Sequence, residues 1–402
     1  MGLESFASGP AARGGLTRRQ TLGAGAAGAA AMVAGGTFAA APALAAGEPR
    51  TFSQGFNTQT QRALTSILIS GSGADQIPGM AVGIWAPGQG NYVAAMGTSD
   101  RATGAPLSLS DHFRIASVSK SFIAHTVLRL VDQRRMTLAD KLESFVPGIP
   151  HGKQITVQQL LAMTSGVYDY VNDPDLTIEE TANPLLPFSL ADVVRIINEH
   201  EPAFAPGADA MYDNSNYYLL GAIIEKVTGN PLHRVVKSQV LDPLGLSQTS
   251  YPTTPAIPAP FSRGYFYEPN LGHRDVTASN PAFAGGAGAM ISTLSDLKVW
   301  AKALATGALL KPATQALRLK SHILAQTPKI TLTYGLGITE VNGFLGHDGA
   351  IVGYGSVVLY LPSRKATIVI LGNNNDNGNP APLNIGLSVA AFLFPEQFPK
   401  GL

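Results

Sequence analysis

The stretch FRIASVSKSF, residues 113–122, places a serine and a lysine three positions apart in an apolar helical pattern. Residues three apart lie on one face of an α-helix, so Ser117 and Lys120 are predicted to be neighbours. A helical lysine usually faces solvent, yet this one is surrounded in the pattern by Ile115, Phe122 and Ile123. The spacing predicts either a buried lysine beside a serine, or an ordinary helix start with a capping serine and a lysine whose tip reaches water.

A buried lysine beside a serine has a definite chemical use. Loss of hydration favours the neutral amine, which lowers the lysine pKa from its ordinary value of about 10.4. Neutral Lys120 could then take the proton of Ser117, whose oxygen would attack an acyl carbon. A serine at a helix N-terminus also offers its backbone N–H to the oxyanion that forms. The four residues alone do not distinguish this chemistry from an ordinary helix start.

A second candidate element, Tyr212-Asp213-Asn214, stands directly before a predicted helix. A tyrosine near a protonated lysine can lose its proton below its free pKa of about 10 and pass a proton to a leaving group. The amide of Asn214 could hold an amide of the substrate. The structural alternatives are a half-buried core tyrosine and a helix N-cap.

A third candidate element, His347-Asp348-Gly349, opens a glycine-rich strand pattern. Glycine in a strand often marks a close approach by a ligand or another backbone segment. The backbone N–H of Ala350 could then supply a second donor to an oxyanion. The alternative is a β-turn with Asp348-Gly349 as its central residues.

Composition and missing motifs exclude several other functions. The chain has no cysteine, which rules out a thiol nucleophile, a disulfide framework and cysteine-bound metal. It has no G-x-S-x-G elbow and no H-E-x-x-H zinc motif, and the asparagine-rich segment 373–379 lacks the closing glutamate of a calcium loop. A net charge of +1 gives no electrostatic basis for binding nucleic acid. We therefore expect no metal and no cofactor.

The hydrophobic pattern predicts an α+β fold. Helical spacing occurs in segments 57–71, 117–133, 156–163, 189–200, 214–229, 296–307 and 381–394. A hairpin is predicted over 79–100, with its turn at 87–90, and further strands over 332–338, 354–362 and 365–373. This order predicts a three-layer α/β/α sandwich: an antiparallel sheet from both chain ends, flanked by helices, with an inserted, mostly helical subdomain at about 135–280 and a site between the two parts.

The first 45 residues have the features of an export signal. Arg18 and Arg19 precede a weakly apolar alanine- and glycine-rich run, which closes on the small-x-small site Ala43-Leu44-Ala45. This pattern predicts a twin-arginine signal that is cleaved, leaving residues 46–402 as one hydrolase domain outside the cytoplasm. No later run is long enough to span a bilayer, so we expect no stable membrane insertion.

Together the three elements, S-x-x-K, Y-x-N and H-x-G in this order, resemble the signature of the serine β-lactamase-like, penicillin-recognising superfamily. The chain looks most like the branch of class C β-lactamases and D-alanyl-D-alanine carboxypeptidases, over about residues 60–395. The resemblance implies that Ser117 is the acylated nucleophile, with Lys120 and Tyr212 sharing the proton transfers and the choice of base left open. It further implies an oxyanion hole made by the backbone N–H groups of Ser117 and Ala350, and substrate contacts by Asn214, His347, Asp348 and Gly349.

The chain departs from the family pattern in ways that affect the expected substrate. Histidine 347 stands where β-lactamases carry lysine, Asp348 replaces the usual threonine or serine, and the segment 337–346 lacks the arginine of many carboxypeptidases. The resemblance implies a D-alanyl-D-alanine carboxypeptidase acting on peptidoglycan stem peptides, with β-lactams as inhibitors. The alternatives are an esterase, a D-amino-acid amidase or aminopeptidase, a β-lactamase, or a non-catalytic binding protein of the same fold.

Overall fold

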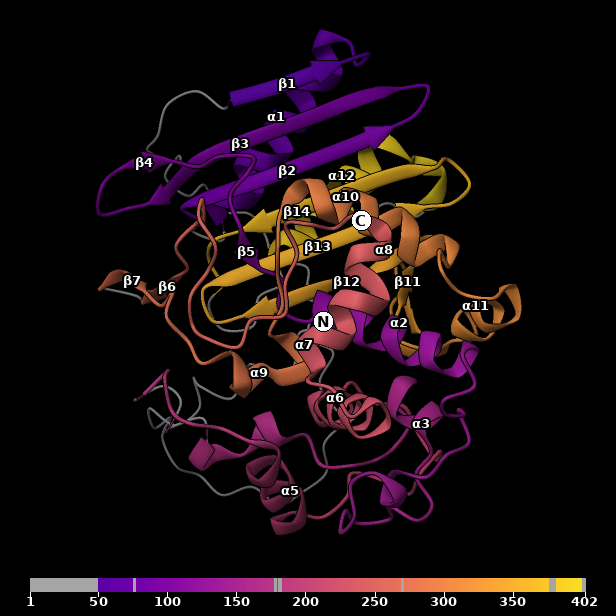
Figure 1. Ribbon diagram of the computed structural model, residues 1–402. Helices are drawn as coiled ribbons and strands as arrows, with labels where there is room; N and C mark the ends of the chain where they lie inside the picture. Colours follow the sequence, from indigo (N-terminus) through magenta and orange to yellow (C-terminus); the bar gives the residue numbers. More distant parts are fainter. Residues whose placement is uncertain are drawn as a thin grey trace, which may run out of the picture.

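Both ends of the chain contribute strands to one large antiparallel sheet (Figure 1). The computed structural model describes residues 50–74, 77–176, 179, 183–268, 271–375 and 381–399. The early strands are β1 (Arg50–Gln54), β2 (Gly79–Ala86), β3 (Gly90–Asp100) and β4 (Ala105–Pro106). The late strands are β9 (His322–Gln326), β10 (Thr331–Tyr334), β11 (Thr339–Val341), β12 (Phe344–Ile351), β13 (Tyr354–Leu361) and β14 (Ala366–Gly372). The predicted signal segment, residues 1–45, lies outside the described residues.

Strand β14 joins the two sets of strands, because it pairs with β2. The resulting order is β1-β3-β2-β14-β13-β12-β11-β10-β9, and β4 pairs with β3 off this path. All residues of β13 and β14 are buried. Their continuous apolar sequences are therefore those of central strands covered on both faces. The hairpin predicted over 79–100 is confirmed as β2 and β3.

Helices cover both faces of this sheet, which confirms the predicted three-layer arrangement (Figure 1). On one face lie α1 (Thr58–Ala74) and α12 (Ala381–Leu393), which pack against each other, and α12 packs on β13 and β14. On the other face lie α2 (Val118–Asp132) and α10 (Leu294–Thr306). Phe122 of α2 stacks on Trp300 of α10 with ring centroids 3.9 Å apart. Helix α2, which follows Ser117, is thus held in the core.

The chain passes through β5 (Phe113–Arg114) and α2 and reaches β8 (Ile291–Ser292) only after an inserted segment, several helices of which lie below the sheet in Figure 1. The longest helices of this segment are α5 (Leu190–Glu199) and α6 (Asn214–Thr228), and α6 contacts α2. The shorter elements are η2 (Leu142–Ser144), α3 (Val157–Leu161), η3 (Tyr170–Asn172), α7 (Leu232–Val236), η4 (Lys237–Leu241), α8 (Asp242–Leu244) and α9 (Pro281–Gly288). Further along the chain lie α11 (Pro312–Arg318) and η5 (Pro395–Gln397).

The strand predicted over 332–338 is wrong beyond Tyr334. The chain turns there: the N–H of Gly335 donates to the carbonyl of Ile338 at 2.8 Å, and Gly337 has a φ of 72°. A left-handed φ suits glycine and ends an extended segment. The pairing resumes as the separate strand β11.

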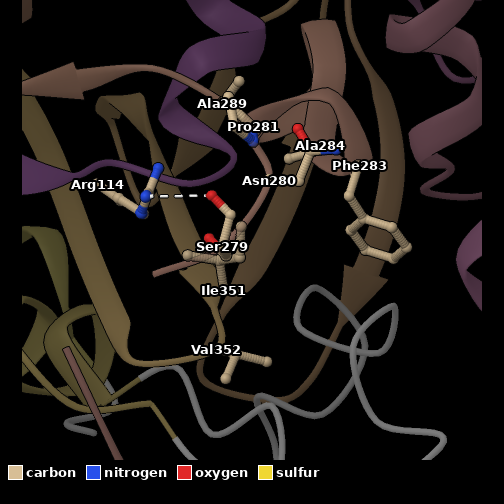
Figure 2. A pocket seen from close by; sticks show the side chains of 10 residues that line it. Arg114, Ser279, Asn280, Pro281, Phe283, Ala284, Ala289, Ile351 and Val352 are labelled. Carbon is tan, nitrogen blue, oxygen red and sulfur yellow. Dashed lines mark hydrogen bonds between the residues drawn. The ribbon is translucent and has the colours of Figure 1, made fainter. Parts of the chain in front are cut away.

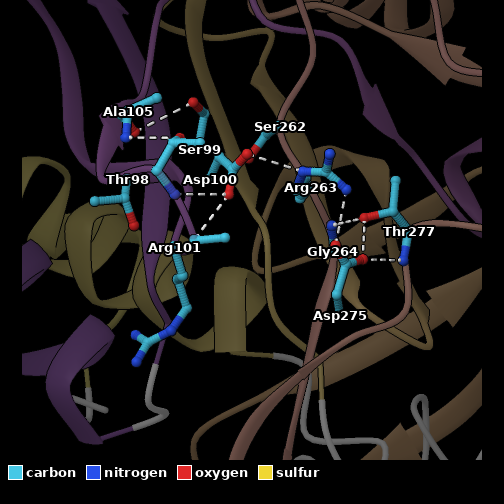
Figure 3. Close-up of polar contacts among 12 residues, drawn as sticks. Thr98, Ser99, Asp100, Arg101, Ala105, Ser262, Arg263, Gly264, Asp275 and Thr277 are labelled. Atoms are coloured by element: carbon cyan, nitrogen blue, oxygen red, sulfur yellow. Dashed lines mark hydrogen bonds and ion pairs between the residues drawn. The ribbon is translucent and has the colours of Figure 1, made fainter.

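Sequence patterning also missed the hairpin of β6 (Tyr265–Glu268) and β7 (Gly272–Asp275). Arg263, just before β6, bridges two carboxylates (Figure 3). Its Nε donates to Asp100 at 3.0 Å and its Nη1 donates to Asp275 at 2.9 Å. These ion pairs connect Arg263 to β3 and to β7, and because they are partly exposed they add little stability. Within the described ranges, no helix has the length and apolar character needed to cross a membrane.

Candidate active site

Ser117 occupies the N-cap of α2, directly after a tight backbone turn. The preceding residue, Ala116, has a φ of 47°, in the left-handed region that costs a non-glycine residue about 1–3 kcal/mol. The turn persists because both flanks are fixed. Before it, the N–H of Ile115 donates to the carbonyl of Met290 at 2.9 Å. After it, α2 is packed into the core. Ser117 itself is half-buried, so it remains accessible to a substrate.

Lys120 is fully buried and makes three hydrogen bonds. Its Nζ lies 2.9 Å from Ser117 Oγ, 2.8 Å from Asn214 Oδ1 and 2.9 Å from the carbonyl oxygen of Ala287. The latter two oxygens can only accept. A neutral amine has two N–H groups and one lone pair. When these N–H groups donate to Asn214 and Ala287, the lone pair points at the hydroxyl of Ser117. This arrangement confirms the predicted proximity of serine and lysine and suits the lysine to take the serine proton.

The pKa of Lys120 is lowered to about 7, chiefly by burial. The carboxyls of Asp169, Asp213 and Asp348, where they are ionised, act in the opposite direction and raise it. Burial disfavours the ammonium form more than these carboxylates favour it. A substantial fraction of the lysine is therefore a neutral base at neutral pH.

Asn214, the first residue of α6, connects the lysine to a buried carboxylate. Its Nδ2 donates to Asp169 Oδ2 at 3.0 Å, while its Oδ1 accepts from Lys120. The neighbouring Asp213 caps the helix by accepting from the N–H of Ser215 at 2.7 Å. Sequence reasoning missed Asp169. It lies in an irregular segment before η3, and no periodicity links it to a residue 45 positions later.

Tyr212 lies beside both catalytic candidates. Its hydroxyl is hydrogen-bonded to the side chain of Ser117, and Lys120 Nζ is 4.8 Å from its ring centroid. The residue is half-buried, but its hydroxyl lies deep among protein atoms. Burial raises the pKa of this phenol well above its usual 10, although the Ser117 hydrogen bond lowers it. The expected loss of the tyrosine proton is thus opposed, because burial and the nearby carboxylates Asp348 and Asp169 all favour the protonated phenol.

Strand β12 lies directly against the start of α2, and Gly349 allows the contact. A Cβ atom there would lie 2.5 Å from the carbonyl oxygen of Ile115, 2.7 Å from Ser356 Oγ and 2.9 Å from the backbone nitrogen of Ser117. Only glycine fits such a spacing. The next residue, Ala350, follows this contact on β12, and its role in an oxyanion hole with Ser117 remains a prediction.

His347 is buried with both ring nitrogens occupied. Nδ1 lies 2.6 Å from the carbonyl oxygen of Asp348, and Nε2 lies 3.1 Å from the hydroxyl of Tyr334. Burial, followed by the charge of Lys120, lowers the pKa of the imidazole to about 3, so the ring is neutral. A carbonyl only accepts, so Nδ1 carries the proton and Nε2 accepts from Tyr334. The imidazole is therefore placed to support the wall of the site, and its predicted contact with substrate stays a prediction.

Asp348 adds negative charge at the same strand. Its residue is half-buried, its carboxylate lies deep among protein atoms, and it interacts electrostatically with Lys120 and Tyr212. Burial raises the pKa of this carboxyl to about 6, opposed by its own backbone N–H and by Lys120. At neutral pH the side chain is mostly ionised.

A small pocket borders this site (Figure 2). It is lined by Phe283, Ala284, Ile351 and Val352, among others. Ile351 directly follows Ala350, and α9, which carries Phe283 and Ala284, also carries Ala287, the carbonyl partner of Lys120. The buried Arg114 closes one side and donates to the carbonyl of Ser279 at 3.4 Å. The pocket is mainly apolar. Two of the elements that line it, α9 and β12, also carry residues of the candidate site.

The fold and the arrangement of the site are those of the β-lactamase/transpeptidase-like superfamily of serine hydrolases. The chain belongs to the beta-lactamase family, whose profile matches residues 61–390. Two curated relatives are each 26% identical to this chain. They are PbpX of Bacillus subtilis (strain 168), named a penicillin-binding protein, and protein flp of Staphylococcus aureus (strain N315). These matches cover 68% and 76% of this chain, but only 64% and 61% of the relatives' own lengths.

Solved structures match over more of their length. A D-stereospecific amidohydrolase from Streptomyces sp. is 29% identical, with a TM-score of 0.70 over 84% of this chain and 98% of that one. The D-amino acid amidase from Ochrobactrum anthropi SV3 is 25% identical, with a TM-score of 0.72 over the same shares. A penicillin-binding protein from Bacillus halodurans, 21% identical with a TM-score of 0.70 over 82% of this chain and 99% of that one, shares the fold.

Proposed function

We propose that this chain is a D-stereospecific amidohydrolase that forms an acyl-enzyme at Ser117. Its substrates would be amides or short peptides of D-amino acids whose amino group is free. The observation that carries this choice is the carboxyl of Asp348, which raises the pKa of Lys120 and lies on the strand beside Ser117. Like charges at about 4 Å repel by roughly 1–4 kcal/mol near a protein surface, so this field disfavours a substrate carboxylate and favours an ammonium group.

The chemical steps follow from the positions of the side chains. Neutral Lys120 takes the proton of Ser117 as the serine oxygen bonds to the amide carbon, and backbone N–H groups stabilise the oxyanion. The C–N bond breaks as the protonated Tyr212 gives its proton to the leaving amine and is reprotonated by Lys120. Water then attacks the ester, its proton passes to the same groups, and Ser117 is released with the acid product.

A D-alanyl-D-alanine carboxypeptidase is the competing function on the same residues. It is supported by the resemblance to that branch and by the relatives named as penicillin-binding. An esterase, a β-lactamase or a non-catalytic binder would use the same cleft. The amidohydrolase is favoured by the two structural neighbours with 25% or more identity, which are named for D-stereospecific amide hydrolysis. We further propose that the enzyme acts outside the cytoplasm, as the sequence of residues 1–45 suggests.

The test compares four substrates with one protein preparation. These are D-alaninamide, L-alaninamide, an N-acylated peptide ending in D-Ala-D-Ala, and benzylpenicillin. We expect hydrolysis of D-alaninamide with kcat/KM at least about tenfold above that of the L-enantiomer. With the amino group and the amide held in place, the methyl group of the L-enantiomer would point in a different direction from that of the D-enantiomer. Faster release of D-alanine from the acylated peptide would replace the proposal with the carboxypeptidase. No turnover of any of these substrates or of a p-nitrophenyl ester would favour the binding protein.

A further inference from the structure

The carboxylate of Asp169 lies directly behind the catalytic lysine. The residue is 2% exposed, and its Oδ2 accepts from Asn214 Nδ2 at 3.0 Å. Its side chain also accepts from the backbone N–H groups of Val171 and Asn214. Burial raises the pKa of Asp169, while these N–H donors and the charge of Lys120 act in the opposite direction and favour the carboxylate. Asp169 is thus held as an acceptor facing one edge of the Asn214 amide.

We infer that Asp169 is a positioning residue for the nucleophilic step, because it fixes which edge of the Asn214 amide faces Lys120. This inference rests on the proposed serine mechanism. A carboxylate accepts hydrogen bonds and cannot donate them. The NH2 group of Asn214 must therefore turn toward Asp169, and its oxygen must turn toward Lys120, as the distance of 2.8 Å between Oδ1 and Nζ shows.

The orientation of this amide decides where the lysine lone pair points. With the oxygen toward Lys120, the neutral amine donates to Asn214 and Ala287, and its lone pair is left for Ser117. If the amide turned over, its NH2 group would face the amine. An Asn214 N–H would then compete with Ser117 for the lone pair, and the lysine would be a poorer base. Asp169 prevents this without touching the substrate or the serine.

The neighbouring Asp213 provides a natural control. It is also buried and lies close enough to Asp169 for their charges to interact. Burial, and then the charge of Asp169, raise the pKa of Asp213 well above its usual value, and its Oδ2 lacks a hydrogen-bond partner. Two neighbouring buried carboxyls repel each other when both are ionised, so the state with one of them protonated is favoured. Asp169 receives more hydrogen bonds, so we place the negative charge on Asp169 and the proton on Asp213. Asp213→Asn therefore changes neither the charge nor the Asn214 contact.

The experiment is a double-mutant cycle on Asp169 and Asn214 in the full chain. The readout is the rate at which a small alkyl fluorophosphonate labels Ser117, followed by intact mass. This reaction needs only the serine and its base, so it does not depend on the identity of the amide substrate. Asp169→Ala is expected to slow labelling about 10–100-fold in the otherwise native chain, the range of a base that has lost its orientation. In an Asn214→Ala background the same change should matter less than about threefold, because effects that pass through one group are not additive.

Equal losses in both backgrounds, or full activity of Asp169→Ala, would overturn the inference, because Asp169 would then act independently of Asn214 or not at all. Asp213→Asn should label within about threefold of the native rate. The melting temperature of each variant is measured alongside. If Asp169→Ala does not fold, the cycle is run with Asp169→Asn, whose amide can present either edge and which should lose roughly three- to tenfold by the same reasoning. Failure of the native protein to label would instead contradict the serine mechanism itself.

Discussion

The side-chain nitrogen of Lys120 and the hydroxyl oxygen of Ser117 lie 2.9 Å apart on one face of α2. The lysine is completely buried and the serine is half-buried. Burial brings the lysine pKa to about 7, and two acceptor oxygens leave its lone pair for the serine. A basic amine and an accessible hydroxyl are thus built into one helical turn, and the predictions below follow from that pairing.

Removing either member of the pair should abolish acylation. We expect Ser117→Ala to show no covalent adduct with any acyl donor, with a melting temperature close to that of the native protein. Lys120→Met keeps most of the side-chain volume without the amine, and should lower kcat/KM by about a thousandfold or more, because nucleophile and base act as a unit. Steady-state kinetics with a p-nitrophenyl ester checks both variants. Native turnover by Ser117→Ala would assign the nucleophile to another residue.

The pH dependence of kcat/KM should report the ionisation of Lys120. The ammonium form has no lone pair, so the rate should be low in acid and rise with pH, with a midpoint near the lysine pKa of about 7. The measurement uses a neutral ester, so that the substrate itself does not titrate. In Asp348→Asn the midpoint should persist but move to lower pH, because a charge that raises the lysine pKa is lost; disappearance of the pH dependence would assign it to the carboxyl of pKa about 6 instead. A rate independent of pH between 5 and 9 would contradict Lys120 as the base.

Tyr212→Phe should affect amides more than activated esters. An amine leaving group needs a proton, whereas p-nitrophenolate leaves without one. We expect a fall of about a hundredfold in kcat on a D-amino acid amide, little change in KM, and a smaller effect on the aryl ester. Tyr334→Phe is the matched control, because its hydroxyl bonds to His347 rather than to Ser117. Equal losses on the two substrates would place Tyr212 in the activation of Ser117 instead.

Asp348 should set the preference for substrate charge. Asp348→Thr removes the repulsion between Asp348 and a substrate carboxylate. The ratio of kcat/KM for N-acyl-D-Ala-D-Ala to kcat/KM for D-alaninamide should therefore rise about tenfold, the size of effect expected from one charge partly screened by solvent. In the native protein the KM for D-alaninamide should rise as the pH falls through about 6, where the carboxyl becomes protonated. An unchanged ratio would show that Asp348 does not act on the substrate.

Gly349→Ala should damage the site through its backbone. The added Cβ would lie 2.9 Å from the nitrogen of Ser117 and 2.5 Å from the carbonyl of Ile115. We expect acylation to fall about a hundredfold, because β12 must move away from the serine N–H. Gly372→Ala on β14, where the nearest atom is 3.4 Å away, is the control and should retain activity. Native-like labelling by Gly349→Ala would show that the contact between β12 and α2 is not needed.

Local periodicity explains why much of this site could be predicted from the sequence. The helical period alone places Ser117 next to Lys120, and the helix following Asp213 could be recognised from its apolar spacing. For His347 to Gly349 the sequence left a glycine-rich strand and a β-turn open, and the structure places both residues on one strand, β12. The layered fold follows from the same patterns, because each apolar face must be covered by another element.

The remaining features depend on long-range contacts that no local pattern encodes. The contact of Asp169 with Asn214 joins a loop to a helix start 45 residues away. The occupied nitrogens of His347 depend on Tyr334, which lies on another strand of the sheet. The raised pKa of Tyr212 arises from burial that a sequence does not display. These contacts, rather than the motifs, support the roles of base and proton donor proposed for Lys120 and Tyr212.

The most direct test of the central claim is the intact mass of the protein quenched in acid during turnover of an aryl ester of D-phenylalanine. We predict a mass increase equal to one phenylalanyl group, mapped by peptide digestion to Ser117, absent from Ser117→Ala and much weaker with the L-ester. Hydrolysis at native rates by Ser117→Ala, or equal adducts from both enantiomers, would contradict a D-stereospecific acyl-enzyme at Ser117.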